Sequence, residues 1–123
     1  MGLPTTPDAE SPVAYYGDET ASPTTTVTRK AVPAGAKTLE LGIFQTTGTV
    51  TTAKFLYVAF NALSNSEEDA MLANPSTRMC IPAGKFEKFV FPVNDPLTRY
   101  AFATDVATET AGSKCIQRIG SLL

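Results

Sequence analysis

The sequence predicts an all-β fold: an antiparallel β-sandwich of the jelly-roll kind, with about seven strands, one short helical link and an extended N-terminal arm. The first observation is composition, because threonine is abundant and is accompanied by 7 Phe, 4 Tyr, 9 Pro and 8 Gly, which favours pleated sheet with short turns. The second observation is a repeated hydrophobic period of two residues in short segments. An immunoglobulin-like sandwich is the alternative, since the sequence does not determine the strand order.

The chain of 123 residues divides into an arm, residues 1–24, and a single sandwich domain, residues 25–123. The arm is rich in Pro, Thr, Ser and Ala, carries acids without Lys or Arg, and has no hydrophobic period. Its one apolar cluster contains Val13, Tyr15 and Tyr16. This pattern predicts an extended segment that adds little to the sandwich core.

The first strands of the domain differ in how clearly they are patterned. Residues 24–32 form a weak strand that ends at Pro33, and Pro33 is placed at the second position of a type I turn with Gly35 at the fourth. Residues 38–44 alternate cleanly, with Leu39, Leu41 and Ile43 on one face. This alternation predicts a half-buried strand.

Residues 49–63 contain the longest strand candidate. Their second half, FLYVAF at 55–60, is apolar on both faces, which predicts a central strand with a covering layer on each side. A buried helix is the alternative, and the β-branched and aromatic content argues against it.

Residues 64–75 predict the one helix, a short link between strands. Ser66 is placed as the N-cap with Asp69 at the capping-box position, and Glu67 and Glu68 fall in the first turn, where the helix dipole favours acids. The helix ends at Asn74, because a residue before proline is disfavoured in the α conformation.

The C-terminal half predicts four further strands. Residues 77–93 hold two strands around the turn Pro82–Gly84, which repeats the turn at residues 33–35; residues 97–105 and 114–123 complete the sheets, joined by a loop at 106–113. Tyr100 and Phe102 are expected to point inward. The predicted aromatic core consists of Phe55, Tyr57, Phe89, Phe91, Tyr100 and Phe102.

No catalytic, metal-binding or cofactor-binding residues are identified, and the chain is predicted not to be an enzyme. The sequence has no histidine, so histidine-based nucleophile activation and the usual metal site of a small jelly-roll barrel are excluded. The 12 acidic residues are interpreted as solvated surface, and Glu67–Asp69 as a helix cap. Cys80 and Cys115 lie on predicted strands and are interpreted as packed, free thiols, with a disulfide as the alternative.

Charge and hydropathy limit the partners that the chain is expected to bind. The net charge of −2 and the scattered basic residues predict no nucleic-acid partner. No apolar run approaches the roughly 20 residues of a membrane helix, and no secretory signal is recognised, so no membrane partner is expected. A protein partner is the remaining hypothesis. Val13, Tyr15 and Tyr16 are the proposed anchors, because tyrosine brings large contact area at low entropic cost; a plain disordered terminus is the alternative.

The segments TLELGIF, FLYVAFNALSNSEEDAMLANPSTRMCIPAGKFEKFVFP and LTRYAFATD…SKCIQRIGSLL, within residues 38–120, resemble small β-sandwich structural proteins of tailed-bacteriophage virions. The resemblance implies a capsid decoration or cement protein, made in the host cytoplasm, whose partner is the major capsid protein of the same virion. A tail or head–tail accessory protein that binds carbohydrate is the alternative, and the absence of Trp argues against it. A homo-oligomer, dimer or trimer, is expected if strand 55–60 is partly an interface.

Overall fold

The computed structural model describes residues 14–21, 23–45, 53–106 and 113–121 of the chain, and it confirms the predicted all-β sandwich. Eight strands and one helix follow in the order β1 (Ala14–Ala21), β2 (Thr28–Ala31), β3 (Ala36–Gln45), β4 (Phe55–Phe60), α1 (Asn65–Ala73), β5 (Met79–Pro82), β6 (Glu87–Val90), β7 (Arg99–Thr104) and β8 (Ser113–Ser121). All strand pairs in the described residues are antiparallel.

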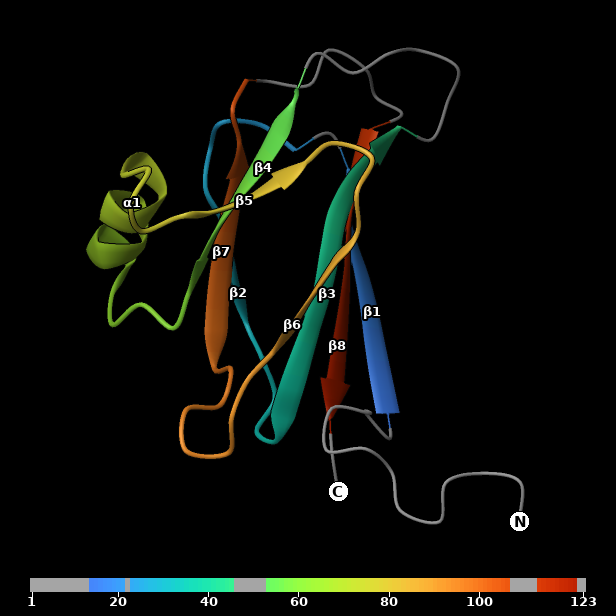
Figure 1. Cartoon of the computed structure of the whole chain (residues 1–123), viewed down its shortest axis with the longest axis vertical. Coiled ribbons are helices and arrows are strands. Elements are labelled where there is room, and N and C mark those ends of the chain that lie inside the picture. Colours follow the sequence, from blue (N-terminus) through green and yellow to red (C-terminus); the bar gives the residue numbers. More distant parts are fainter. Residues whose placement is uncertain (1–13, 22, 46–52, 107–112, 122–123) are drawn as a thin grey trace.

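The strand order is that of an eight-stranded jelly roll. One sheet has the order β1-β8-β3-β6 and the other β2-β7-β4-β5 (Figure 1). Strands β1 and β8, β2 and β7, β3 and β6, and β4 and β5 are therefore neighbours, as they would be in one long hairpin. Rolling that hairpin up brings β8 beside β3 and β7 beside β4. Helix α1 lies at its tip, between β4 and β5.

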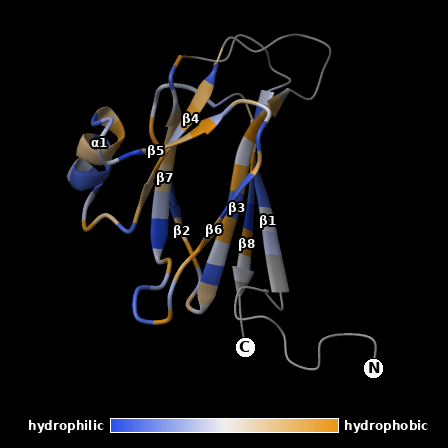
Figure 2. Ribbon diagram, viewed as in Figure 1, coloured by the Kyte–Doolittle hydropathy of each residue, from blue (hydrophilic) through white to orange (hydrophobic). Residues whose placement is uncertain are grey.

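The core lies between the two sheets and follows the alternation of the strands. Leu39, Leu41 and Ile43 of β3 are fully buried on the inner face, as the sequence predicts. Tyr100 and Phe102 of β7 are buried opposite them in the same cluster, with ring centroids 6.2 Å apart, which confirms their predicted inward direction. Figure 2 shows hydrophobic and hydrophilic bands along β3 and a largely hydrophobic β4.

Strand β4 lies between β7 and β5 and is covered on both faces, as predicted. Its inner face carries Leu56, Val58 and Phe60, while on its outer face Ala59 packs with Leu72 of α1. Phe55, at the start of the strand on the same face, stays 37% exposed. The homo-oligomer expected through this strand stays a prediction.

The predicted aromatic core needs one correction, because the alternation places the odd-numbered residues of β4 outside. Tyr57 packs beside α1 on the outer face, and Phe55 is 37% exposed. Phe60 takes their place between the sheets and packs edge-on against Phe89 and Phe91, with centroids 4.8 and 5.2 Å away. A run that is apolar on both faces gives no periodic signal to distinguish inner from outer positions.

Helix α1 begins earlier than the sequence predicts. Its N-cap is Ser64 and not Ser66: the Ser64 hydroxyl accepts a hydrogen bond from the Glu67 backbone N–H, and the Glu67 carboxylate accepts one from the Leu63 N–H at 3.2 Å. Glu67 therefore holds the capping-box position in place of Asp69. The helix ends at Ala73 with Asn74 as its C-cap, in agreement with the predicted stop before proline.

The two repeated turns are both present, with a register one residue away from the prediction. Pro33 and Pro82 accept hydrogen bonds from the N–H groups of Ala36 and Lys85, so each proline is the first residue of its turn. Gly35 and Gly84 then occupy the third position with φ of 88° and 83°. Positive φ at that position is typical of a type II turn and explains the glycine in both copies.

Candidate functional site: the β1 edge and the adjoining arginine pocket

Strand β1 is an element that the sequence does not predict. Its 8 residues come from the predicted arm, and they pair along their full length with β8, from Ala14 opposite Ser121 to Ala21 opposite Lys114. The stretch is free of proline between Pro12 and Pro23, which lets it join a ladder. The two prolines that flank this stretch are the one feature of the sequence that could have indicated a strand here. Hydrophobic alternation is absent because β1 lies at a sheet edge and contributes little to the core.

The structure brings two of the three proposed anchors onto this strand. Tyr15 lies opposite Gly120 and Tyr16 opposite Ile119. The Tyr16 side chain is 55% exposed, although its cross-strand neighbour Ile119 is buried. Val13 lies outside the described residues. The role of the three residues as anchors stays a prediction.

The charged half of β1 is tied to its own domain. Asp18 accepts a hydrogen bond from Lys30 Nζ at 2.7 Å, which links the edge of one sheet to β2 at the edge of the other. This bond, followed by a bond from the Glu19 backbone N–H, holds the pKa of Asp18 below its usual value of 3.8. Glu19 pairs with Lys114 of β8 at 3.0 Å. The other half of β1, Ala14–Gly17, carries no charge.

Strand β1 is the longest of the four edge strands in the described sheets. The other edges, β2, β5 and β6, have four residues each. β2 carries Arg29 and Lys30, β6 carries charged residues, and β5 ends in Pro82. Short length, charge and proline are the features by which proteins protect sheet edges from further pairing. β1 as a whole is twice as long, and its uncharged half contains neither charge nor proline.

A second polar site lies where α1 meets β2 and β7, and it corrects the interpretation of the acids as solvated. Glu68 of α1 is fully buried. Its carboxylate accepts hydrogen bonds from Arg29 Nη1 at 3.0 Å, from Arg99 Nε at 3.0 Å and from Arg99 Nη2. Asp69, more exposed, pairs with Arg29 at 2.8 Å, and its hydrogen bond is the main cause that raises the pKa of Arg29. Buried charge is retained here because it is paired.

The sequence does not predict this ion-pair cluster, because each arginine lies 31 to 40 residues from the carboxylate that it pairs with. Arg29 and Arg99 point to the outer face of their sheet at neighbouring positions, opposite Ala101 and Ala31 in the β2–β7 ladder. The first turn of α1 then places Glu68 between them. Only the long-range pairing of β2 with β7 joins the two arginines.

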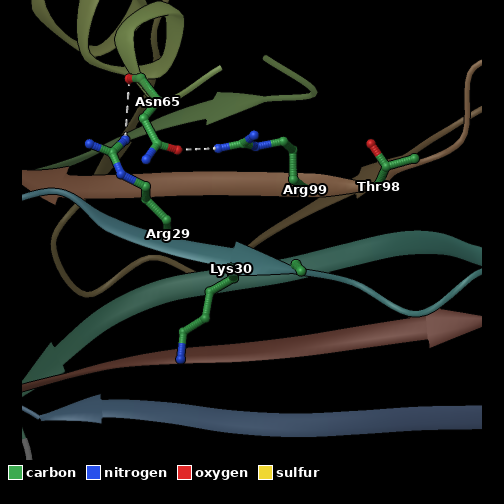
Figure 3. A pocket seen from close by; sticks show the side chains of 6 residues that line it. Arg29, Lys30, Asn65, Thr98 and Arg99 are labelled. Carbon is green, nitrogen blue, oxygen red and sulfur yellow. Dashed lines mark hydrogen bonds between the residues drawn. The ribbon is translucent and has the colours of Figure 1, made fainter. Parts of the chain in front are cut away.

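A hollow of about 370 Å³ adjoins the cluster and is lined by Arg29, Lys30, Ala31, Asn65, Thr98 and Arg99. Figure 3 shows the Asn65 amide meeting the Arg99 guanidinium, while Lys30 points away from them, toward β1. The Asn65 side-chain oxygen accepts from Arg99 Nη2 at 2.9 Å, and its backbone oxygen from Arg29 Nη1 at 3.4 Å.

The two cysteines are both free, as predicted, but only one is packed. Cys115 of β8 is fully buried, and burial raises the pKa of its thiol to about 12. Cys80 is exposed, which corrects the expectation that both thiols are packed. It lies opposite Tyr57 on the outer-facing side of edge strand β5. Ile81, next to it, takes the inward position.

The described residues contain neither a metal-ligand cluster nor a helix that could cross a membrane. No cluster of three or more Cys, Asp or Glu in this part of the chain could hold a metal ion. The one helix there, α1, is too short and too polar to cross a membrane.

Comparison with known proteins gives only weak structural likenesses. No family model matches the chain, and no curated protein matches it. A chain of Bacillus endospore appendages, described as a novel family of disulfide-linked pili, aligns at 12% identity and a TM-score of 0.40, covering 98% of this chain and 100% of that one. A chain of the cyanophage Pam1 capsid asymmetric unit aligns at 18% identity and a TM-score of 0.34, with coverage of 98% and 100%. Likenesses at this level do not establish a shared function.

Proposed function

We propose that the chain is a non-enzymatic structural protein of a virion, a capsid decoration protein that binds the assembled major capsid protein through the β1 edge. Val13, Tyr15 and Tyr16 are its proposed anchors. The observation that carries the proposal is the exposed Tyr16 on the longest edge strand of the described sheets. The resemblance of residues 38–120 to small β-sandwich proteins of tailed-phage virions supports the choice of partner.

The β1 edge suits one established way of binding, the addition of a partner strand to an open sheet edge. Main-chain hydrogen bonds then give affinity, and alternate side chains give specificity. Tyr16 supplies a large ring with few rotatable bonds, which costs little entropy when it becomes ordered. Because a shell repeats the same subunit many times, a protein with more than one contact gains avidity without any strong single contact.

Co-sedimentation with empty capsid shells tests this function. The double substitution Tyr15→Ala and Tyr16→Ala is expected to weaken binding by about 2–4 kcal/mol, because interface energy concentrates in a few aromatic residues. Leu63→Ala is the matched control, since Leu63 is 89% exposed and lies in the link between β4 and α1. The control should bind as the wild type does.

Two outcomes contradict the proposal. Wild-type protein that stays in the supernatant at micromolar shell concentration would exclude decoration of that shell. Equal binding by the double variant and the wild type, with both folded by thermal unfolding, would exclude the tyrosines as anchors. A deletion of residues 1–13, which keeps β1, separates the contribution of Val13 from that of the strand.

A further inference from the structure

We propose that the hollow beside Arg99 and Asn65 is a binding site for a carboxylate. Of the six residues that line it, Arg29, Lys30 and Arg99 are cationic and none is acidic. A concave surface of one charge sign concentrates ligands of the opposite sign. This site is separate from the β1 edge, and the inference does not depend on the proposed decoration function.

The carboxylates that offset these cations do not line the hollow. Glu68 is fully buried beneath the two guanidiniums, Asp69 contacts Arg29 from helix α1, and Asp18 contacts Lys30 from β1. The lining therefore presents hydrogen-bond donors, while the negative charge lies behind it or outside it.

Two donor groups at the hollow have no hydrogen-bond partner among the described residues. Arg99 uses Nε and Nη2 for Glu68 and Asn65, which leaves Nη1. Asn65 accepts with its side-chain oxygen, which leaves the two N–H groups of Nδ2. Because Glu68 holds Arg99 through two bonds, the guanidinium is already oriented before a ligand arrives, which reduces the entropy lost on binding. Asn65 is the first residue of α1, where the helix dipole adds a partial positive charge.

The local charge balance selects a monoanion. The three cations are matched by three nearby carboxylates, so a singly charged ligand adds less uncompensated charge than a doubly charged phosphate does. One planar carboxylate also matches the free edge of a guanidinium and an adjacent amide. The carboxylate could be supplied by a free small acid or by an acidic side chain of a protein partner, which have the same recognition chemistry.

NMR titration of the full chain with sodium acetate, against sodium chloride at equal ionic strength and pH 7, tests the site. We expect saturable shifts of the Arg99 Nε–H and Asn65 side-chain amide signals, with a Kd on the order of 1–10 mM for so small a ligand. A C-terminally amidated peptide containing one Glu should shift the same signals, and its amidated Gln analogue should not, if the natural source is a protein side chain. Shifts by acetate and not by the Glu peptide identify a free acid as the source. Shifts that do not saturate, or that chloride reproduces, would overturn the proposal.

Two substitutions locate the site. Asn65→Asp keeps an oxygen for Arg99 but replaces the free amide donor with a carboxylate, so acetate affinity should fall more than tenfold. Ser66→Asp is the matched control, because it adds the same charge one residue further along α1 at an exposed position that does not line the hollow; its affinity should stay within about threefold of wild type. If Asn65→Asp fails to fold, Ala31→Glu on the exposed lining position is expected to give the same loss. Wild-type affinity in a folded blocking variant, or phosphate binding tighter than acetate, would contradict the assignment.

Discussion

The buried carboxylate of Glu68 gives the sharpest test of the structure, because the sequence alone places it in solvent. We predict that Glu68→Gln destabilises the fold by about 2–3 kcal/mol. The substitution preserves volume, so it leaves no cavity, and the whole effect comes from the two arginines.

The magnitude follows from the three hydrogen bonds that the carboxylate accepts. Glutamine has one acceptor oxygen, and its amide nitrogen would face a guanidinium donor of Arg29 or Arg99. Each hydrogen bond to a charged group contributes about 1.5–3 kcal/mol. Two of the bonds end on Oε1 and one on Oε2, so glutamine loses at least one bond outright, and its neutral oxygen accepts the others more weakly. Both guanidinium side chains keep about 30% of their surface exposed, so water recovers part of this loss, and the expected total is about 2–3 kcal/mol.

Urea unfolding measures this cost as a change in midpoint at constant m-value. Glu67→Gln is the matched control: it makes the same chemical change one residue earlier in the first turn of α1, at an exposed position. The control should cost less than about 1 kcal/mol, since only an exposed capping bond is affected. A cost below about 0.5 kcal/mol for Glu68→Gln would refute the buried ion-pair cluster.

Three further predictions address the core, the link between the sheets and the thiols. Phe102→Ala should cost about 3–5 kcal/mol in unfolding free energy, because the ring is fully buried; a loss below about 1 kcal/mol would contradict its position. The hydrogen bond from Lys30 lowers the pKa of Asp18 in the folded protein. The pair therefore stabilises the fold at a pH above 3.8, the usual pKa of the carboxyl group, and this stabilisation is lost as the pH falls through the lower pKa of the folded state. Wild type should therefore unfold at a higher temperature than Asp18→Asn at pH 7, by a margin that closes on acidification below about pH 4; a margin independent of pH contradicts this. Ellman's reagent should label Cys80 in the native protein and Cys115 only after unfolding; two fast-reacting thiols, or none in denaturant, would be inconsistent with the structure.

The sequence predicts the fold where the pattern is local. The alternation of Leu39, Leu41 and Ile43, the inward pair Tyr100 and Phe102, and the two Pro-Ala-Gly corners are all found in the structure. These features depend on neighbouring residues, whose period and turn chemistry are visible in one dimension.

The features that the sequence does not reveal depend on pairing between distant strands. β1 has no hydrophobic period, and only the completed jelly roll shows that β8 pairs with a strand from before residue 24. Similarly, the sequence around Glu68 is typical of an exposed acid in the first turn of a helix. Only the fold brings Arg29 of β2 and Arg99 of β7 into contact with it. Tyr15 and Tyr16 are proposed as anchors from the sequence, which does not predict their place on an edge strand.

The number of copies on purified particles tests the proposed capsid role most directly. Quantitative mass spectrometry of the virion, with the major capsid protein as internal reference, gives that number. A decoration protein that binds the shell lattice through its β1 edge is predicted at a copy number close to a simple fraction of the capsid protein. A few copies per particle would indicate the tail or the head–tail junction, and complete absence from purified particles would contradict a structural role in the virion.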